Sequence, residues 1–248
     1  MVDQRLQGQT AIVTGGSQRI GKAIASRLAE LGANIVIHYN QSVSEAEKVK
    51  MKLVDRGVKA WTIQADLSKS DDYETLVKRA WDLSGSIGII VNNASVFSSG
   101  DLMKLSFNEL IKNFEVNAWA PFVIGRKFKE YSGGGSIINI LDTRIADTDL
   151  KHPAYILSKK MLHELTGMMA VEFAPGIRVN AVAPGLILPP SGKDKSYLNE
   201  LTGTVPLKRH GKPGDVADAA GFLAMSDFVT GQVIYVDGGR HMREYENG

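Results

Sequence analysis

The sequence predicts one α/β domain, with a doubly wound parallel sheet of about seven strands and helices on both of its faces. Short apolar segments rich in Val and Ile alternate with longer segments of helical period, which is the pattern of parallel strands joined by crossover helices. The 248 residues contain no internal repeat, linker or low-complexity segment. Because an α/β core can bury a chain of this length, we expect a single domain over residues 1–248.

The composition excludes several classes of protein. The formal net charge is only +2 and the chain has no basic block, so nothing predicts binding to nucleic acid or to a membrane surface. The chain has no cysteine, which excludes disulfides, thiolate catalysis and cysteine-ligated metal sites. The first nine residues are polar and no apolar run approaches ~20 residues, so we expect a soluble, cytoplasmic protein.

The first half of the chain is expected to alternate strand and helix. Residues 10–14 are β-branched and lead into a glycine turn, after which apolar residues at helical spacing run from Ile20 to Leu31 before Gly32. The next expected elements are strands at 34–38, 59–63 and 87–91 and helices at 44–56 and 71–83. The last of these strands is apolar throughout, which indicates burial on both faces of the sheet.

The second half begins with one long helix, expected at 106–130. A glycine cluster leads into an apolar strand at 136–141, and Pro153 suits the first turn of the helix that follows. Gly176 ends that helix, and the remaining expected elements are a strand at 178–183, a helix at 215–225 and a strand at 232–236. Residues 184–213 are rich in Gly, Pro and Lys with one short helical piece at about 197–201, so we expect a mobile flap at about 186–212 near a ligand.

Three polar residues are expected to meet at the carboxyl end of the strand 136–141. Asp142 follows this strand directly, and Tyr155 and Lys159 lie four residues apart on one face of the next helix. Open α/β sheets bind their ligands at this edge. A nearby cation stabilises phenolate and lowers the pKa of a tyrosine, so Tyr155 could exchange protons near neutral pH. The alternative is an ordinary exposed pair on a helix.

A glycine turn joins the first strand to the first helix. Its sequence, Thr14-Gly-Gly-Ser-Gln-Arg-Ile-Gly21, places free backbone N–H groups at a helix amino terminus, where the diphosphate of a dinucleotide binds. It departs from the strict GxGxxG pattern, so an ordinary tight turn is the alternative. Arg19 favours the dinucleotide, because a cation in the first helical turn is unfavourable unless an anion lies nearby. Its guanidinium could fork onto phosphate oxygens, lie over a flat ligand, or stay on the solvated surface. The candidate cofactor contacts here are Gly15, Ser17, Arg19, Ile20 and Gly21.

The end of the second strand is expected to select the cofactor. An acid there would accept from the ribose 2′-hydroxyl of NAD and repel the 2′-phosphate of NADP. The candidate contacts, His38, Asn40, Gln41 and Ser42, include no acid, so NADP is favoured over NAD, although no arginine or lysine stands there either. Beyond the third strand, Asp66 and Leu67 could meet the adenine ring, or Asp66 could cap the following turn.

Together these residues resemble the short-chain dehydrogenase/reductase family over nearly the whole chain, which implies a Rossmann-type fold and NAD(P)-dependent oxidoreductase activity. The matching motifs are TGxxxxxG at 14–21, Asn92-Asn93-Ala94 after the fourth strand, Asn117 in the long helix, Tyr155-x-x-x-Lys159, and Pro184-Gly185 after the sixth strand. The resemblance implies that Tyr155 is the acid/base, that Lys159 lowers its pKa and holds the ribose, and that Asn117 keeps a proton-relay water. Asn93, Ala94, Pro184 and Gly185 are then expected to contact the cofactor.

Departures from the common family pattern indicate a subgroup. Asp142 stands where a serine is usual, Arg19 replaces a glycine of the turn, and Ser95 and Phe97 follow Asn93-Ala94 where glycine is common. This combination resembles the pteridine reductases and the bacterial dihydromonapterin or dihydrofolate reductases, as does the tail from Val236 to Arg243. The resemblance implies that Phe97 and the nicotinamide sandwich a pterin, while Arg19 and Ser95 contact pterin and cofactor phosphate. Basic residues common in that subgroup are replaced here by Gln18 and Gln41.

The chemistry of Asp142 favours the same subgroup. A serine hydroxyl donates to a substrate carbonyl, whereas an ionised carboxylate only accepts and would repel that oxygen. A heterocycle with N–H donors and a ring nitrogen that needs a proton suits Asp142 better. Asp142 could pass a proton through Tyr155, bind the amino edge of a pterin, or only cap the following loop through Thr143 or Arg144. Phe97, similarly, is either a stacking wall or an ordinary core aromatic.

The sequence therefore predicts an NADPH-dependent reductase of a pterin or dihydropterin/dihydrofolate-like ring, with Asp142, Tyr155, Lys159 and Asn117 as catalytic residues. The alternatives are a 3-oxoacyl carrier-protein reductase or other ketone or polyol oxidoreductase of the family, and a nucleotide-binding regulatory protein without turnover. No spacing suggests a metal, and His152 and His210 are lone histidines that could touch substrate. By the resemblance we also expect a homotetramer built on the long helices and the last strand, with Arg243 near a neighbouring subunit's site.

Overall fold

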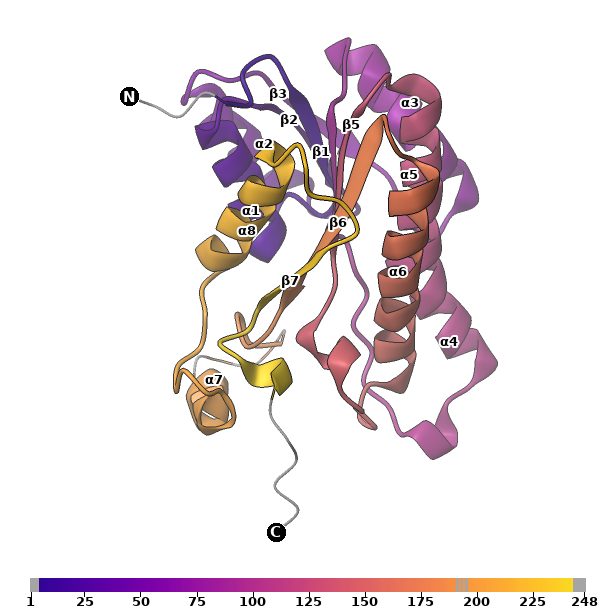
Figure 1. Cartoon of the computed structure of the whole chain (residues 1–248), viewed down its shortest axis with the longest axis vertical. Helices are drawn as coiled ribbons and strands as arrows, with labels where there is room; N and C mark the ends of the chain where they lie inside the picture. Colours follow the sequence, from indigo (N-terminus) through magenta and orange to yellow (C-terminus); the bar gives the residue numbers. More distant parts are fainter. Residues whose placement is uncertain (1–4, 191, 193, 195, 243–248) are drawn as a thin grey trace.

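The computed structural model describes residues 5–190, 192, 194 and 196–242. Its centre is a parallel sheet of seven strands in the order β3-β2-β1-β4-β5-β6-β7 (Figure 1). The strands are β1 (Thr10–Val13), β2 (Asn34–Tyr39), β3 (Ala60–Gln64), β4 (Ile89–Asn92), β5 (Gly135–Ile140), β6 (Ile177–Pro184) and β7 (Val233–Val236). The strand order reverses between β1 and β4, as in a doubly wound sheet, so the predicted fold class is confirmed.

Helices cover both faces of the sheet. They are α1 (Arg19–Glu30), α2 (Val43–Val54), α3 (Ser70–Ser84), α4 (Phe107–Phe114), α5 (Ala120–Tyr131), α6 (Pro153–Glu172), α7 (Ser196–Leu201) and α8 (Pro213–Met225). α1, α2 and α8 lie on one face, and α3, α5 and α6 on the other (Figure 1). Neighbouring strand residues alternate between these layers, so that Val13 packs with α1 and α8 while Ile12 packs with α3 and α5. Burial on both faces explains why the strands are continuous apolar runs.

The long helix expected at 106–130 is interrupted. It consists of α4, a π-helical turn at Glu115–Trp119 and α5, and the Ala120 N–H donates to Glu115 O, five residues back. The prediction of one continuous helix was wrong, because apolar periodicity does not reveal a single extra residue in a turn. π-helical turns of this kind are frequent at functional sites. Asn117 lies at the middle of this one with a fully buried side chain.

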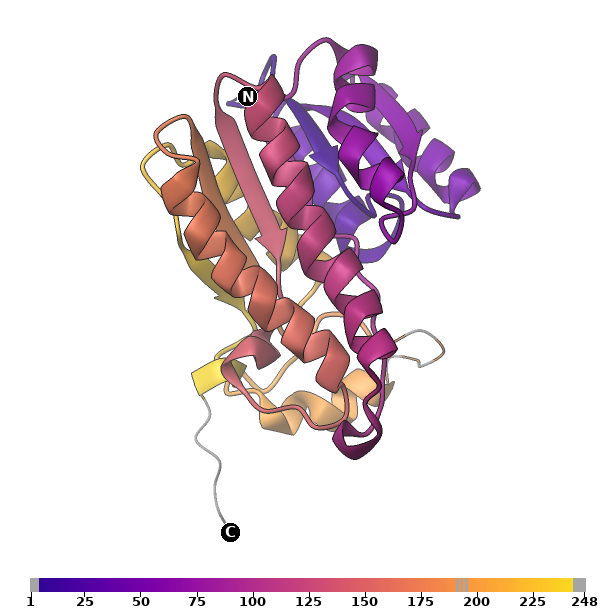
Figure 2. The same cartoon turned by 90° about the vertical axis from the view of Figure 1, so that its right-hand side faces the viewer.

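The segment between β6 and α8 contains α7, which matches the short helical piece expected at about 197–201. Residues 191, 193 and 195 of the expected flap, and Arg243, lie outside the described residues. Figure 2 shows α5 and α6 side by side across one face, with α7 beyond the carboxyl ends of the strands. In the described part of the chain, no helix combines the length and the apolar character needed to cross a lipid bilayer.

Candidate active site

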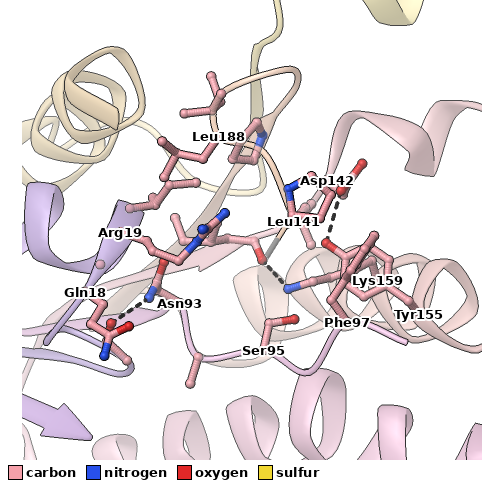
Figure 3. A pocket seen from close by; sticks show the side chains of 18 of the residues that line it. Gln18, Arg19, Asn93, Ser95, Phe97, Leu141, Asp142, Tyr155, Lys159 and Leu188 are labelled. Atoms are coloured by element: carbon pink, nitrogen blue, oxygen red, sulfur yellow. Dashed lines mark hydrogen bonds between the residues drawn. The ribbon is translucent and has the colours of Figure 1, made fainter. Parts of the chain in front are cut away.

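A cavity of about 520 Å³ lies at the carboxyl ends of the central strands, where open α/β sheets bind ligands (Figure 3). The predicted residues that line it are Gly15, Ser17, Arg19, Ile20, Gly21, His38, Asn40, Ser42, Asn93, Ala94, Ser95, Phe97, Asp142, Tyr155, Lys159, Pro184 and Gly185. Among the described residues of its wall, Asp142 is the one carboxylate, against the cations of Arg19, Arg144, Lys159 and Arg240. This balance of charge suits a ligand that carries several negative charges.

Hydrogen bonds join the glycine turn before α1 to the segment after β4. Thr14 Oγ1 accepts from the backbone N–H groups of Asn93 (2.8 Å) and Ala94 (2.9 Å), and Asn93 Nδ2 donates to Thr14 O (2.8 Å). Gly15 has a φ of 60°, a conformation that favours glycine. A Cβ atom at Gly21 would lie 2.2 Å from Gly15 O, so only glycine allows this closure. The result is a tight loop at the amino terminus of α1, a place suited to phosphate.

The buried ring of His38 supports the glycine turn. Its Nδ1 accepts from the Gly15 N–H (3.1 Å), and its Nε2 donates to Ala65 O (3.0 Å). Because a backbone N–H can only donate, the ring is fixed as the neutral Nε2–H tautomer. Burial lowers the pKa of His38 to about 4. Both ring nitrogens are bonded within the protein, so His38 supports the proposed cofactor site through the turn and not through a ring nitrogen.

Arg19 connects the glycine turn to the segment after β6. Its Nη2 donates to Pro189 O (2.7 Å), although Arg19 itself is exposed. Its backbone has a φ of 51°, in the left-handed region that favours glycine. At the same end of the cavity, Ser17 Oγ and Ser42 Oγ lie 3.2 Å apart, which brings the turn and the segment after β2 together.

Asp142, Tyr155 and Lys159 meet at the carboxyl end of β5 (Figure 3). Tyr155 Oη donates to Asp142 Oδ2 (3.0 Å), and Lys159 Nζ donates to Ile140 O (2.7 Å). Lys159 Nζ lies 5.8 Å from the centroid of the Tyr155 ring, one helical turn away on α6. The two side chains are buried, so they are not an ordinary exposed helix pair.

The pKa of Tyr155 differs from the sequence prediction. Burial, together with the negative charge of Asp142, raises it well above the usual 10.0, because both disfavour the phenolate. Burial also lowers the pKa of Lys159 to about 8. The expectation that a nearby cation lowers the pKa of Tyr155 was wrong for this arrangement, in which desolvation outweighs the cation.

Arg144 forms a bidentate ion pair with Asp142. Its Nε donates to Asp142 Oδ1 and its Nη2 to Asp142 Oδ2, both at 2.9 Å. Its backbone N–H also donates to Oδ1 (2.9 Å), which caps the 3-10 turn Thr143–Ala146. Asp142 therefore caps the following loop and at the same time accepts from Tyr155, so capping is not its only contact. Passage of a proton through Tyr155 stays a prediction.

Phe97 forms part of the cavity wall and is not a core residue. Its side chain is 45% exposed. The ring stacks on His152 at a centroid distance of 4.6 Å and meets the ring of Tyr155 edge-on at 4.7 Å. An aromatic face next to the Tyr155 ring is suited to packing against a flat ligand.

Known proteins with similar sequences identify the family. A family model described as enoyl-(acyl carrier protein) reductase matches residues 15–241. A 3-oxoacyl-[acyl-carrier-protein] reductase, FabG, of Staphylococcus epidermidis is 33% identical over 244 residues, which cover 94% of this chain and 99% of that protein. The chain belongs to the short-chain dehydrogenase/reductase family. The family predicted from the motifs is thereby confirmed.

Solved structures of this short-chain dehydrogenase/reductase fold are similar over nearly their whole length. FolM alternative dihydrofolate reductase 1 from Brucella canis, complexed with NADP, has a TM-score of 0.90 at 33% identity and covers 97% of each chain. The FolM protein from Brucella suis, also with NADP, has a TM-score of 0.92 at 32% identity and covers 100% of this chain and 99% of its own. The angucycline C-6 ketoreductase LanV with bound NADP has a TM-score of 0.90 at 29% identity, over 96% and 98%.

Four predicted site residues of this short-chain dehydrogenase/reductase lie outside the cavity wall, namely Gln41, Asp66, Leu67 and Asn117. Asp66 Oδ1 accepts from the N–H (3.1 Å) and Oγ (2.8 Å) of Ser68, which is the turn-capping alternative. These bonds lower the pKa of Asp66. Leu67 is buried in the core. Asp66 thus caps the turn through Oδ1, and the expected contact of Asp66 and Leu67 with an adenine ring stays a prediction.

The side chain of Asn117 holds the segment after β4. Its Oδ1 accepts from Ser95 Oγ (3.0 Å) and the Val96 N–H (2.9 Å), and its Nδ2 donates to Val96 O and Ser158 Oγ, both at 2.9 Å. Asn117 therefore positions Ser95 and, through it, the start of the loop that carries Phe97. Its part in keeping a relay water stays a prediction.

The cavity wall also contains residues that were not named singly as site residues. They are Gln18, Tyr39, Ile140, Leu141, Thr143, Arg144, Leu186, Ile187, Leu188, Pro190, Tyr197, Leu201 and Arg240. The spacing Asp142-x-Arg144 could have indicated the ion pair, because a side chain two residues on can fold back in a turn. Leu186, Ile187, Leu188, Pro190, Tyr197 and Leu201 belong to the segment 186–212 that was expected to lie near a ligand, although none of them was named singly. Of the two lone histidines, His152 lines the cavity, whereas His210 does not and its Nδ1 lies 2.8 Å from Gly211 O.

Proposed function

We propose that this protein is a cytoplasmic, NADPH-dependent reductase of a pterin or dihydropterin/dihydrofolate-like ring. The proposal rests on one observation. The hydroxyl of Tyr155 donates a hydrogen bond to the carboxylate of Asp142 (3.0 Å). A carboxylate repels a carbonyl oxygen and accepts from N–H groups, so this site favours a nitrogen heterocycle. Phe97, packed on Tyr155, offers such a ring a stacking surface.

The cavity wall fits NADPH. The glycine turn lies at the amino terminus of α1, where backbone N–H groups can bind phosphate. A Cβ at Gly21 would clash with Gly15 O, so the turn needs glycine at this position. Ser42, after β2, and Ser17, from the glycine turn, bring two hydroxyls together, and none of the described wall residues after β2 is an acid that would repel a 2′-phosphate. The NADP bound to the FolM proteins and to LanV supports the same cofactor.

The residues of the cavity have separate proposed roles in the reaction. The reduced nicotinamide supplies a hydride when bound. Tyr155 is the proposed proton donor, because its raised pKa keeps the hydroxyl protonated at neutral pH. Lys159 holds the ribose, and Asp142 orients the Tyr155 hydroxyl and accepts from the substrate. Asn117 positions Ser95.

A 3-oxoacyl carrier-protein reductase is the second candidate function. Staphylococcus epidermidis FabG is 33% identical over nearly the full length, and LanV is a ketoreductase. Tyr155 could protonate a carbonyl oxygen in such a reaction, but Asp142 supplies no second donor to that oxygen. A regulatory protein without turnover, the remaining alternative, leaves the buried cluster of Asp142, Tyr155 and Lys159 without a role.

Steady-state turnover tests the proposal. The wild type and Asp142→Ser are compared with a dihydropterin and with an acetoacetyl thioester, each with NADPH and with NADH. We expect the dihydropterin and NADPH to be preferred, and kcat/KM for the dihydropterin to fall on the order of 10²-fold in Asp142→Ser, the scale of a lost acid/base partner. Asp55→Ser, an exposed position at the end of α2, is the matched control. Turnover of the thioester alone would show that the ketone alternative is right.

We also propose that the enzyme is a homotetramer. The outer face of α6 exposes Leu157, Met161, Met168 and Val171, and Phe107 of α4 is exposed beside it. β7 is an outer strand of the sheet, and no other strand among the described residues pairs with its outer edge. An apolar helix face and an open edge on one molecule favour association with further copies of the chain.

A further inference from the structure

Asp142 has little hydrogen-bonding capacity left for a substrate. A carboxylate offers about four acceptor positions, two on each oxygen. Oδ1 accepts from the backbone N–H and the Nε of Arg144, and Oδ2 accepts from Nη2 of Arg144 and from Tyr155 Oη. Arg144 therefore fills all but one of these positions, and the position that is left is the one that Tyr155 uses.

Arg144 is itself held firmly by groups other than Asp142. Its Nη1 donates to Asp149 Oδ2 (2.6 Å), and the same carboxylate oxygen lies 2.8 Å from His152 Nδ1. The guanidinium carbon lies 5.4 Å from the ring centroid of Phe97 and 5.5 Å from that of Tyr155. Only 21% of its side chain is exposed. A planar guanidinium held in this way fixes the plane of the Asp142 carboxylate, which a single ammonium group could not do.

We infer that Arg144 is a positioning residue that leaves Asp142 one acceptor position, which the Tyr155 hydroxyl and one N–H of the substrate occupy in turn. When the hydroxyl rotates away from Oδ2 toward a substrate, the freed position can accept a substrate N–H. Binding of an N–H donor and release of the Tyr155 hydroxyl toward the substrate are then one coupled event. The inference rests on the proposed function in one respect, namely that the substrate brings an N–H donor to Asp142.

A merely structural role for Arg144 makes a different prediction. Arg144 also joins Asp142 to Asp149, so it could serve only to close the loop between β5 and α6. In that case its replacement would lower stability and activity whether or not Asp142 is present. If Arg144 acts through Asp142, replacing Arg144 lowers activity only in a protein that still has Asp142. A double-mutant cycle separates the two cases.

The experiment uses Arg144→Lys, which keeps a cation next to both carboxylates and removes the planar fork. We expect kcat/KM for a dihydropterin with NADPH to fall roughly 10-fold in Arg144→Lys, the scale of one or two lost charge-assisted bonds. In the Asp142→Ser background we expect the same substitution to change kcat/KM by less than about 3-fold. The thermal midpoint and the NADPH dissociation constant of each variant check the fold, and the exposed Arg56→Lys is the matched control.

Losses that multiply in the double variant would overturn the inference, as would full activity of Arg144→Lys. Failure of the proposed function is a separate result. If only the acetoacetyl thioester is turned over, the pterin proposal fails. The same cycle measured with the thioester then shows whether Arg144 still acts through Asp142, and an absence of coupling there would overturn the inference as well.

Discussion

His38 links the glycine turn to the pH dependence of folding. Its pKa is lowered by burial to about 4, compared with 6.5 for an unperturbed histidine. Between these values the unfolded chain binds a proton on His38 and the folded chain does not, so the stability decreases as the pH falls. The contribution of the neutral ring is complete above pH 6.5, and below about pH 4 both states are protonated.

We expect His38 to lower the free energy of unfolding by roughly 3 kcal/mol as the pH falls from 6.5 to about 4, since each pKa unit is worth about 1.4 kcal/mol. Urea denaturation at several pH values across this range measures it. The pKa values of Asp149 and Asp237 are lowered from 3.8. The stability that these two carboxylates contribute is therefore lost mainly below pH 3.8, outside the range in which His38 titrates. His38→Asn should flatten the slope, whereas the exposed control His163→Asn should keep it. An unchanged slope in His38→Asn would contradict the assignment.

The π-helical turn Glu115–Trp119 is the element that aims Asn117 at the segment after β4. The side chain of Asn117 joins three parts of the fold, because it bonds Ser95, Val96 and Ser158 of α6. The π-helical turn holds one residue more than a regular α-helical turn. Without that residue, the side chains on one side of the turn would be rotated by about 100° relative to those on the other, and Asn117 would lose these partners.

Replacing Asn117 by alanine removes the acceptor of the Val96 N–H and one donor each to Val96 O and to the buried Ser158 Oγ. We expect a loss of about 1–3 kcal/mol in the free energy of unfolding, the scale of leaving one buried polar group without its partner. Turnover should also fall, because the loop that carries Ser95 and Phe97 loses its anchor. Chemical denaturation and steady-state kinetics of Asn117→Ala are compared with Asn108→Ala, an exposed position on α4. Equal stability of the two variants would contradict this role.

Elements defined by local chemistry could be predicted from the sequence, whereas features set by tertiary contacts could not. Apolar runs gave all seven strands, and Pro153 marked the start of α6, because these signals lie within a few residues. The π-helical turn is not visible in the sequence, since one extra residue leaves the apolar pattern nearly unchanged. The bond from Arg19 to Pro189 spans 170 residues. The raised pKa of Tyr155 depends on how deeply α6 is buried, which the motif Tyr155-x-x-x-Lys159 does not encode.

On the scale of the whole molecule, α6 is apolar on two sides. One side packs on the sheet through residues such as Leu162 and Met169. The other side presents Leu157, Met161, Met168 and Val171, and Met168 and Val171 are 67% and 82% exposed. These four residues are spaced as one helical stripe, in which the exposed Glu164 also lies, and Figure 2 shows α6 on the outside of the molecule beside α5. A helix that is apolar on both sides is expected to be buried on both, so a second copy of the chain is the proposed cover.

The double substitution Met168→Glu with Val171→Glu tests this surface. Two carboxylates on the stripe should prevent another copy from packing there, so the mass measured by light scattering should fall from about four times 26.9 kDa to a dimer or monomer. Val54→Glu, exposed on α2 at the opposite face, should leave the mass unchanged. An unchanged mass in the double variant would mean that the stripe is not an interface. Because Asp142, Tyr155 and Lys159 all lie within one chain, the separated subunits should still bind NADPH. Loss of that binding on dissociation would therefore show that subunit packing holds the cofactor site in shape.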